Sequence, residues 1–214
     1  MNLRKGLAFA GVTILTAATA SQAHAAEPSE LQQQIDTVLA NTTGGVQISP
    51  NEIAWEGGQA IMSFPLPGEE VAPPSSQAAI DLQTQQAGVS KQSVKAAAAA
   101  GEALAAASDS CPTEVFGNDW YCFYQYRDFG GRRLQWNQAK HDVVFFSQFD
   151  FVNKTSSWSN KGGKYIYVQG RSQTGYDRSC WEKPLILWQE APHTSKAFVG
   201  SSLDNKADCF WTSY

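Results

Sequence analysis

The sequence lacks the patterns that mark most enzymes and nucleic-acid-binding proteins. It has only three histidines, and it contains neither the G-x-S-x-G pattern of serine hydrolases nor the H-E-x-x-H pattern of zinc proteases. His141 is followed by Asp142, but neighbours in a strand face opposite sides, so they do not form a catalytic pair. Neither half of the chain is strongly basic, which argues against a nucleic-acid partner. We therefore expect a non-enzyme with no cofactor of its own.

No apolar run reaches the roughly 20 residues that a membrane-spanning helix needs. Residues 1–25 have the pattern of a signal peptide, with Arg4 and Lys5 before an apolar stretch and an A-x-A cleavage site at its end. We expect a secreted, extracellular protein that has no membrane contact in its mature form.

Cysteine is absent from residues 1–110, and no two of the four cysteines form a C-x-x-C pair. In an exported protein, four such cysteines are more typical of two disulfides than of a zinc site. Three pairings are possible. Closure of short loops favours Cys111 with Cys122 and Cys180 with Cys209, although the sequence alone does not fix the pairing.

The two halves of the chain differ in composition. Residues 27–107 hold nine acidic residues against two lysines, a net charge of -7. Residues 108–214 hold all four cysteines, 22 of the 25 aromatic residues and a net charge of +1. This contrast argues against one uniformly folded globule. After the signal peptide it predicts a small α+β N-terminal unit over residues 27–66, a flexible linker or pro-segment over residues 67–109, and a folded domain over residues 110–214.

Local patterns predict the elements of these parts. Residues 29–40 indicate a helix capped by Ser29, and short strands are expected around the Gly57–Gly58 turn. The C-terminal part contains β-rich runs separated by turn residues, which is typical of an all-β sandwich or small barrel. These runs are FYQY, RRLQW, VVFFSQFDF, KYIYV, PLILWQ and AFVG.

One stretch of the C-terminal part, CFYQYRDFGGRRLQW, resembles the opening strand pair of a βγ-crystallin Greek key, with Tyr124 and Gly131 at its aromatic and glycine positions. The segments FVNKTSSW and LDNKADCF resemble the two calcium-signature turns of that family. More closely, the whole arrangement resembles the secreted proteins of peptidase inhibitor family I36, including their longer actinobacterial members. The resemblance implies a βγ-crystallin-like double Greek-key sandwich.

The same resemblance implies a function. It points to a monomeric inhibitor of an extracellular protease, with a metalloprotease as the expected target. The inhibitory bond of the family lies beside a disulfide cysteine, and here that position falls on Cys180 and Trp181, within a polar loop over residues 170–183. A large apolar residue just after the cleaved bond suits metalloproteases of the thermolysin type. A rigid loop would bind like substrate without being released as product.

The calcium question is separate. The signature turns offer five side-chain ligands, namely Asn153, Ser156, Asp204, Asn205 and Asp208. Val152 replaces one expected ligand and Cys209 another, so we expect calcium binding to be weak or absent. Two alternatives stay open: a calcium-binding structural protein, and a cell-wall or carbohydrate-binding module that uses its many aromatics as stacking platforms. A row of exposed Trp and Tyr would favour the latter, and a protruding loop at Cys180 would favour inhibition.

Overall fold

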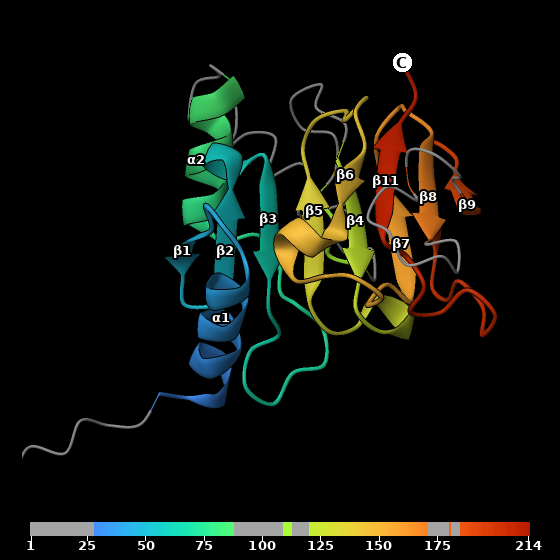
Figure 1. The fold of residues 1–214 in the computed structure, drawn as a ribbon. Coiled ribbons are helices and arrows are strands. Elements are labelled where there is room, and N and C mark those ends of the chain that lie inside the picture. Colours follow the sequence, from blue (N-terminus) through green and yellow to red (C-terminus); the bar gives the residue numbers. More distant parts are fainter. Residues whose placement is uncertain (1–27, 88–108, 113–119, 171–179, 181–184) are drawn as a thin grey trace, which may run out of the picture.

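The structure, a computed structural model, describes residues 28–87, 109–112, 120–170, 180 and 185–214. The predicted signal peptide lies outside these ranges. Figure 1 shows a mostly β architecture of two antiparallel sheets with two short helices, as the expected all-β class requires. Within the described ranges, no helix combines the length and the apolar character needed to cross a bilayer.

The larger sheet has seven strands in the order β1-β2-β3-β5-β4-β7-β10. Its strands are β1 Val46–Ser49, β2 Glu52–Trp55, β3 Ala60–Ser63, β5 Arg133–Trp136, β4 Tyr121–Tyr124, β7 Ser157–Asn160 and β10 Thr194–Lys196. The smaller sheet has the order β6-β11-β8-β9. Its strands are β6 Val144–Phe145, β11 Cys209–Thr212, β8 Ile166–Gly170 and β9 Leu185–Glu190. Short 3-10 turns occur at Glu56–Gly58, Arg127–Phe129 and Phe146–Phe149.

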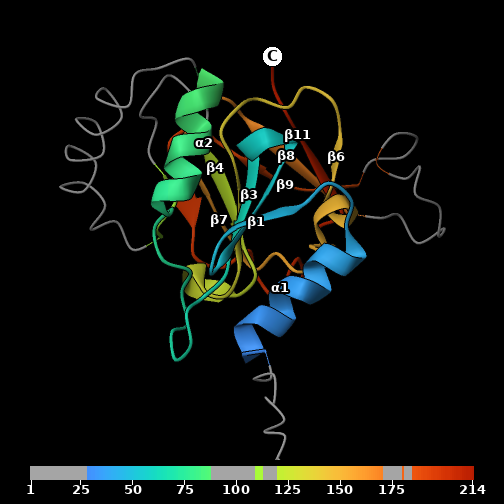
Figure 2. The ribbon, with the colours of Figure 1, turned by 90° about the vertical axis from the view of Figure 1, so that its left-hand side faces the viewer.

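The helices lie on opposite faces of the seven-stranded sheet (Figure 2). Helix α1, Glu30–Asn41, begins where the Ser29 hydroxyl accepts a hydrogen bond from the Gln32 amide at 3.2 Å, and it buries Ile35 and Val38 in the core. This confirms the helix predicted over residues 29–40. Helix α2, Gln77–Ala87, packs on the other face, where its Ala79 and Leu82 meet residues of β2 and β3.

The expected separation of an N-terminal unit from the C-terminal domain needs correction. Strand β3 pairs with β5 at four positions, from Ala60 opposite Trp136 to Ser63 opposite Arg133. One apolar core also includes residues of both halves, so each half completes the other. Composition did not reveal this, because the N-terminal half contributes mostly aliphatic side chains to a core whose aromatic members, apart from Trp55 and Phe64, come from the C-terminal half.

The stretch predicted as a linker, residues 67–109, is also more ordered than expected where the structure describes it. Val71 forms a parallel bridge with Gly131, the Ser76 amide donates to Glu52, and α2 follows directly. At its other end Asp109 is 3% exposed. These parts of the stretch therefore belong to the folded body.

The strand predictions for the C-terminal part were uneven. Runs FYQY, RRLQW, KYIYV and PLILWQ overlap strands β4, β5, β8 and β9. The run VVFFSQFDF forms only the two residues of β6 before the chain turns at Phe146, and AFVG forms no strand. Strands β7, β10 and β11 were missed, because SWSN and TSK lack the apolar alternation that the prediction relied on.

Glu190, at the end of β9, is a carboxyl group inside the protein. It is fully buried and accepts a hydrogen bond from the Trp188 indole at 3.0 Å. Burial raises the pKa of Glu190 well above its ordinary value, and the Trp188 hydrogen bond only partly opposes this shift. The folded state therefore holds the proton of Glu190 at a pH where the unfolded chain has released it.

This difference predicts a pH-dependent effect of Glu190→Gln. Below the ordinary pKa of a glutamate the variant and parent should have similar stability. As the pH rises above that value, the parent should lose stability relative to the variant by about 1.4 kcal/mol per pH unit, until the raised pKa of the folded state is reached. Urea unfolding between pH 4 and pH 9 measures the difference. The exposed substitution Glu69→Gln is the control, and parallel curves for parent and Glu190→Gln would contradict the prediction.

Candidate functional site

Both disulfides close short loops in the sequence. Cys111 pairs with Cys122, 11 residues apart, and Cys180 pairs with Cys209, 29 residues apart. This is the pairing that loop length favours. All four cysteines are buried, so each disulfide attaches a connecting segment to a strand of the body.

The Cys180–Cys209 bond lies on the outward face of the smaller sheet. Phe210 points into the core, and because neighbouring residues of a strand alternate, Cys209 and Trp211 point outward. Between Cys180 and Trp211 lies the side chain of Gln169. With its nitrogen toward Cys180 it donates to that carbonyl at 3.2 Å, and its oxygen accepts from the Trp211 indole at 3.1 Å. Cys180 is thus held through both its side chain and its carbonyl oxygen.

The ends of the segment that carries Cys180 are fixed by the sheet itself. Gly170 is the last residue of β8 and lies opposite Leu185, the first residue of β9. A side chain at Gly170 would approach the Lys206 carbonyl within 2.8 Å, so glycine allows this close packing. The segment 171–184 is therefore attached to the sheet at three places: at Gly170, at Leu185 and at Cys180.

Most of the predicted inhibitory loop, including Trp181, lies outside the described residues. What the structure provides is its anchor, Cys180, and its two ends. Sequence reasoning identified the cysteine but missed Gln169, because a single glutamine in a strand carries no signal of what its side chain will contact.

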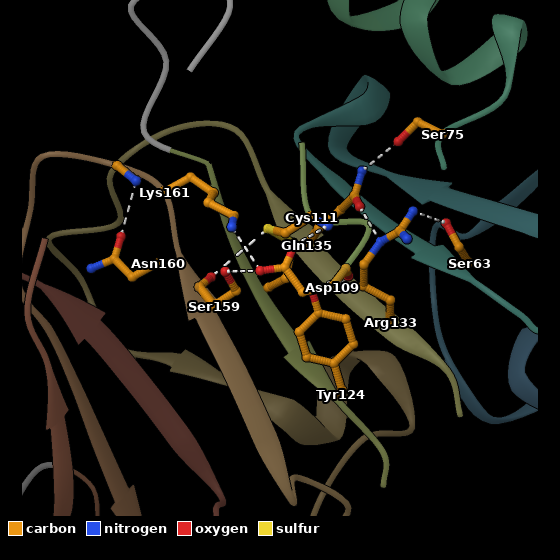
Figure 3. The surroundings of a disulfide bond; sticks show 12 residues. Ser63, Ser75, Asp109, Cys111, Tyr124, Arg133, Gln135, Ser159, Asn160 and Lys161 are labelled. Carbon is orange, nitrogen blue, oxygen red and sulfur yellow. Dashed lines mark hydrogen bonds and ion pairs between the residues drawn. A yellow bond between two sulfur atoms is a disulfide. The ribbon is translucent and has the colours of Figure 1, made fainter. Parts of the chain in front are cut away.

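The Cys111–Cys122 disulfide fastens the segment 109–112 to the outward face of the larger sheet (Figure 3). Asp109 organises this attachment: its carboxylate accepts from the Cys111 amide at 3.0 Å, from the Ser159 hydroxyl at 2.8 Å and from Lys161 Nζ at 2.6 Å. The Tyr124 hydroxyl donates to the Asp109 carbonyl at 2.6 Å, and burial raises the pKa of that hydroxyl, which keeps it a donor.

A buried arginine lies on the same face, where β5 meets the N-terminal half (Figure 3). Arg133 is fully buried and donates to Gln135 at 2.7 Å, to Ser63 at 3.2 Å and to the Ala72 carbonyl at 3.3 Å. Burial lowers the pKa of Arg133, while nearby groups including Glu52 oppose that shift. Ser63 also donates to Glu52 at 3.3 Å, so one hydroxyl connects the buried carboxylate to the buried guanidinium.

The hairpin between β4 and β5 folds back tightly, as its glycine pattern predicted. Gly131 has φ +71°, and a side chain there would come within 2.8 Å of Gln125 and Tyr126. The aromatic ring over Gly131 is therefore that of Tyr126. Tyr124, which the sequence pattern indicated, packs instead on Phe129 with ring centroids 5.3 Å apart.

The two signature turns pair with each other in a reciprocal way. The Asn153 amide donates to the Ala207 carbonyl at 2.9 Å, and the Asn205 amide donates to the Thr155 carbonyl at 3.1 Å. Both asparagines have a left-handed backbone, with φ 54° and 55°. Sequence reasoning placed these residues in turns correctly, but it did not reveal that the turns contact each other.

Only part of the predicted calcium ligand set comes together. Ser156 Oγ lies 2.5 Å from Asp204 Oδ1 and 3.0 Å from the Gln125 carbonyl oxygen. Asp208 is buried, and its backbone bonds to Gln169 and Phe146. The three oxygens around Ser156 are fewer than the six to eight that calcium takes. The described residues also contain no group of three or more His, Cys, Asp or Glu suited to a metal.

The remaining candidates give little support to catalysis or sugar stacking. His141 stacks on exposed Tyr214 with ring centroids 4.6 Å apart, and His193 lies in the exposed turn before β10. Within the described ranges, Trp188 and Trp211 are half-buried and the other tryptophans are buried. Trp211 also stacks on Tyr167 at 4.2 Å, which covers one face of each ring.

Comparison with known proteins gives one match. Residues 105–182 match the model of peptidase inhibitor family I36, a segment that runs from just before Asp109 to just after Cys180. The match confirms, over this segment, the resemblance to peptidase inhibitor family I36 found in the sequence. No curated protein and no solved structure matches the chain significantly.

The buried connection through Ser63 predicts that Glu52→Gln destabilises the protein. Removing the carboxylate leaves Arg133 buried with less compensating charge, so the free energy of unfolding should fall by about 3 kcal/mol. Urea denaturation at pH 7 measures this change. Glu69→Gln, on the exposed loop after β3, should change it by less than about 0.5 kcal/mol. Equal effects of the two substitutions would show that the charge of Glu52 is not needed.

The incomplete ligand set predicts that calcium leaves the stability unchanged. A site with a Kd of about 10 μM would stabilise the protein by about 2.7 kcal/mol at about 1 mM calcium, because the ion would be at 100 times its Kd. We expect the same Tm in excess calcium and in excess EGTA. A calcium-dependent rise of several degrees, abolished by Asp204→Asn, would contradict this expectation.

Proposed function

Because residues 105–182 match peptidase inhibitor family I36, we propose that this protein is an exported inhibitor that blocks an extracellular protease with the loop around Cys180. A protease is the partner that the family implies. The finer parts of the proposal are the choice of a metalloprotease, export through the signal peptide, action as a monomer, and function without a cofactor.

The observation that carries the proposal is the triple attachment of the loop. Its ends meet at the Gly170–Leu185 pair, and Cys180 is fixed by the disulfide to Cys209 and by the Gln169 side chain. Binding a flexible loop costs free energy because the loop must be ordered, whereas a preformed loop avoids much of that cost. From Cys180 the chain needs only residues 181–184 to reach β9. The Cys180–Trp181 bond therefore follows directly after the strongest attachment.

A large apolar residue after that bond supports a metalloprotease as the target. Trp181 occupies this position, and thermolysin-type proteases favour such a residue there. The disulfides also support export, because they form in oxidising compartments.

We also propose that strands β4 to β11 form the two Greek keys of a βγ-crystallin-like sandwich. The strand orders support this: one sheet contains β5-β4-β7 with β10, and the other contains β9-β8-β11 with β6. Strands β4, β5 and β7 of the larger sheet correspond to β8, β9 and β11 of the smaller one. The third strand of each set of four, β6 in β4–β7 and β10 in β8–β11, pairs in the other sheet. The reciprocal bonds of Asn153 and Asn205 have the same symmetry.

The decisive experiment is titration of thermolysin, subtilisin and trypsin with the mature chain, residues 26–214, carrying both disulfides. The full mature chain is needed because β3 completes the sheet beside β5. We expect loss of thermolysin activity, and we expect Trp181→Ala to raise the inhibition constant by roughly 30-fold, the effect of removing a central aromatic contact.

Tyr214→Ala is the matched control, since Tyr214 is 90% exposed at the C-terminus. It should leave the inhibition constant unchanged. Failure of the mature chain to inhibit any of the three proteases would reject the proposed function. Inhibition of subtilisin or trypsin alone would retain the inhibitor and reject the metalloprotease as its target.

A further inference from the structure

Two apolar side chains at the start of β9 are unusually exposed for residues of a strand. Leu185 is 52% exposed and Ile186 is 54% exposed. Single exposed apolar residues are common on protein surfaces, but two adjacent ones on a sheet edge are a more specific feature. β9 is the last strand of its sheet, and no other described strand pairs with its outer side. Within the described part of the chain, the exposed apolar start of β9 and its unpaired backbone edge thus lie together.

These residues lie beside the anchor of the loop. Ile186 is in register with Gln169, and Gln169 is in turn in register with Cys209. The Gln169 side chain contacts the Cys180 carbonyl at 3.2 Å. One cross-strand row therefore connects exposed Ile186, through Gln169, to the Cys180–Cys209 disulfide.

The other half of the fold shows that an edge of this kind accepts a partner strand. β5 follows β4 as β9 follows β8, and each pairs antiparallel with its predecessor. The outer side of β5 is occupied by β3, again in antiparallel pairing. The corresponding side of β9 has no such partner from the described parts of the chain.

We propose that Leu185, Ile186 and the outer edge of β9 form a second contact surface for the target protease, next to the Cys180–Trp181 bond. This inference rests on the proposed function. Proteases bind extended chain on both sides of the bond they attack, and β9 is the extended segment that follows this bond after residues 181–184. A protease seated at Cys180 would therefore meet Leu185 and Ile186 next. Their exposure in the free protein then provides apolar surface to bury on binding.

The test compares the double variant Leu185→Ser/Ile186→Ser with the parent, as mature chains with both disulfides, against the protease that the parent inhibits most strongly. We expect the inhibition constant to rise at least about tenfold, because central apolar contacts account for much of an interface's affinity. The Tm should stay close to that of the parent, since both side chains are largely exposed. Val46→Ser is the control, because Val46 is 62% exposed on the far edge strand β1.

The possible failures are distinguishable. A parent that inhibits no protease rejects the proposed function and this surface with it. A parent that inhibits, together with a double variant of equal potency and equal Tm, rejects the surface alone. If size-exclusion chromatography shows that the parent is a dimer and the equally potent double variant a monomer, the surface joins two copies of this chain, and the proposal is overturned.

Discussion

The contact between aromatic rings from the two sheets is the interaction on which the rest of the structure depends. Phe123 and Trp136 of the larger sheet meet Phe210 of the smaller one, with ring centroids 5.1 and 4.7 Å apart. Such offset and edge contacts add to the burial of apolar area and fix the sheets relative to each other. The residue before Phe210 is Cys209, so the disulfide that holds the loop is attached to the backbone of the core itself. The disulfide therefore attaches Cys180 directly to a strand of the core.

The N-terminal half stabilises the folded body in another way. By pairing with β5 it removes one exposed sheet edge, and by covering Arg133 it makes part of the sheet surface an interior. Sheet edges left open invite pairing with other chains. The two halves therefore differ at equivalent strands: the outer edge of β5 is covered by β3, whereas the outer edge of β9 has no partner strand among the described residues.

Some of this could be predicted from the sequence and some could not. Helix α1 was predictable because Ser29 and the Ile35–Val38 spacing are local signals. The hairpin at Gly131 and the match to the inhibitor family were predictable from short motifs. The union of β3 with β5 was not, because pairing between distant strands leaves no trace in local composition. Strand β7, with the sequence SWSN, was missed because it lacks the apolar alternation typical of strands. Its buried serines instead donate to the Tyr126 carbonyl and to the Asp109 carboxylate. The role of Gln169 depends on its contacts with Cys180 and Trp211, which its neighbours in the sequence do not indicate.

The way in which residues 171–184 are attached has a consequence for what happens if a protease does cut between Cys180 and Trp181. The new carboxyl end would remain joined to β11 through sulfur, and the new amino end would remain only a few residues from its place in β9. Hydrolysis would then yield a nicked molecule instead of separate fragments. Because the severed termini stay close together, cleavage gains little of the entropy that normally favours it. The bound enzyme can then also form the peptide bond again.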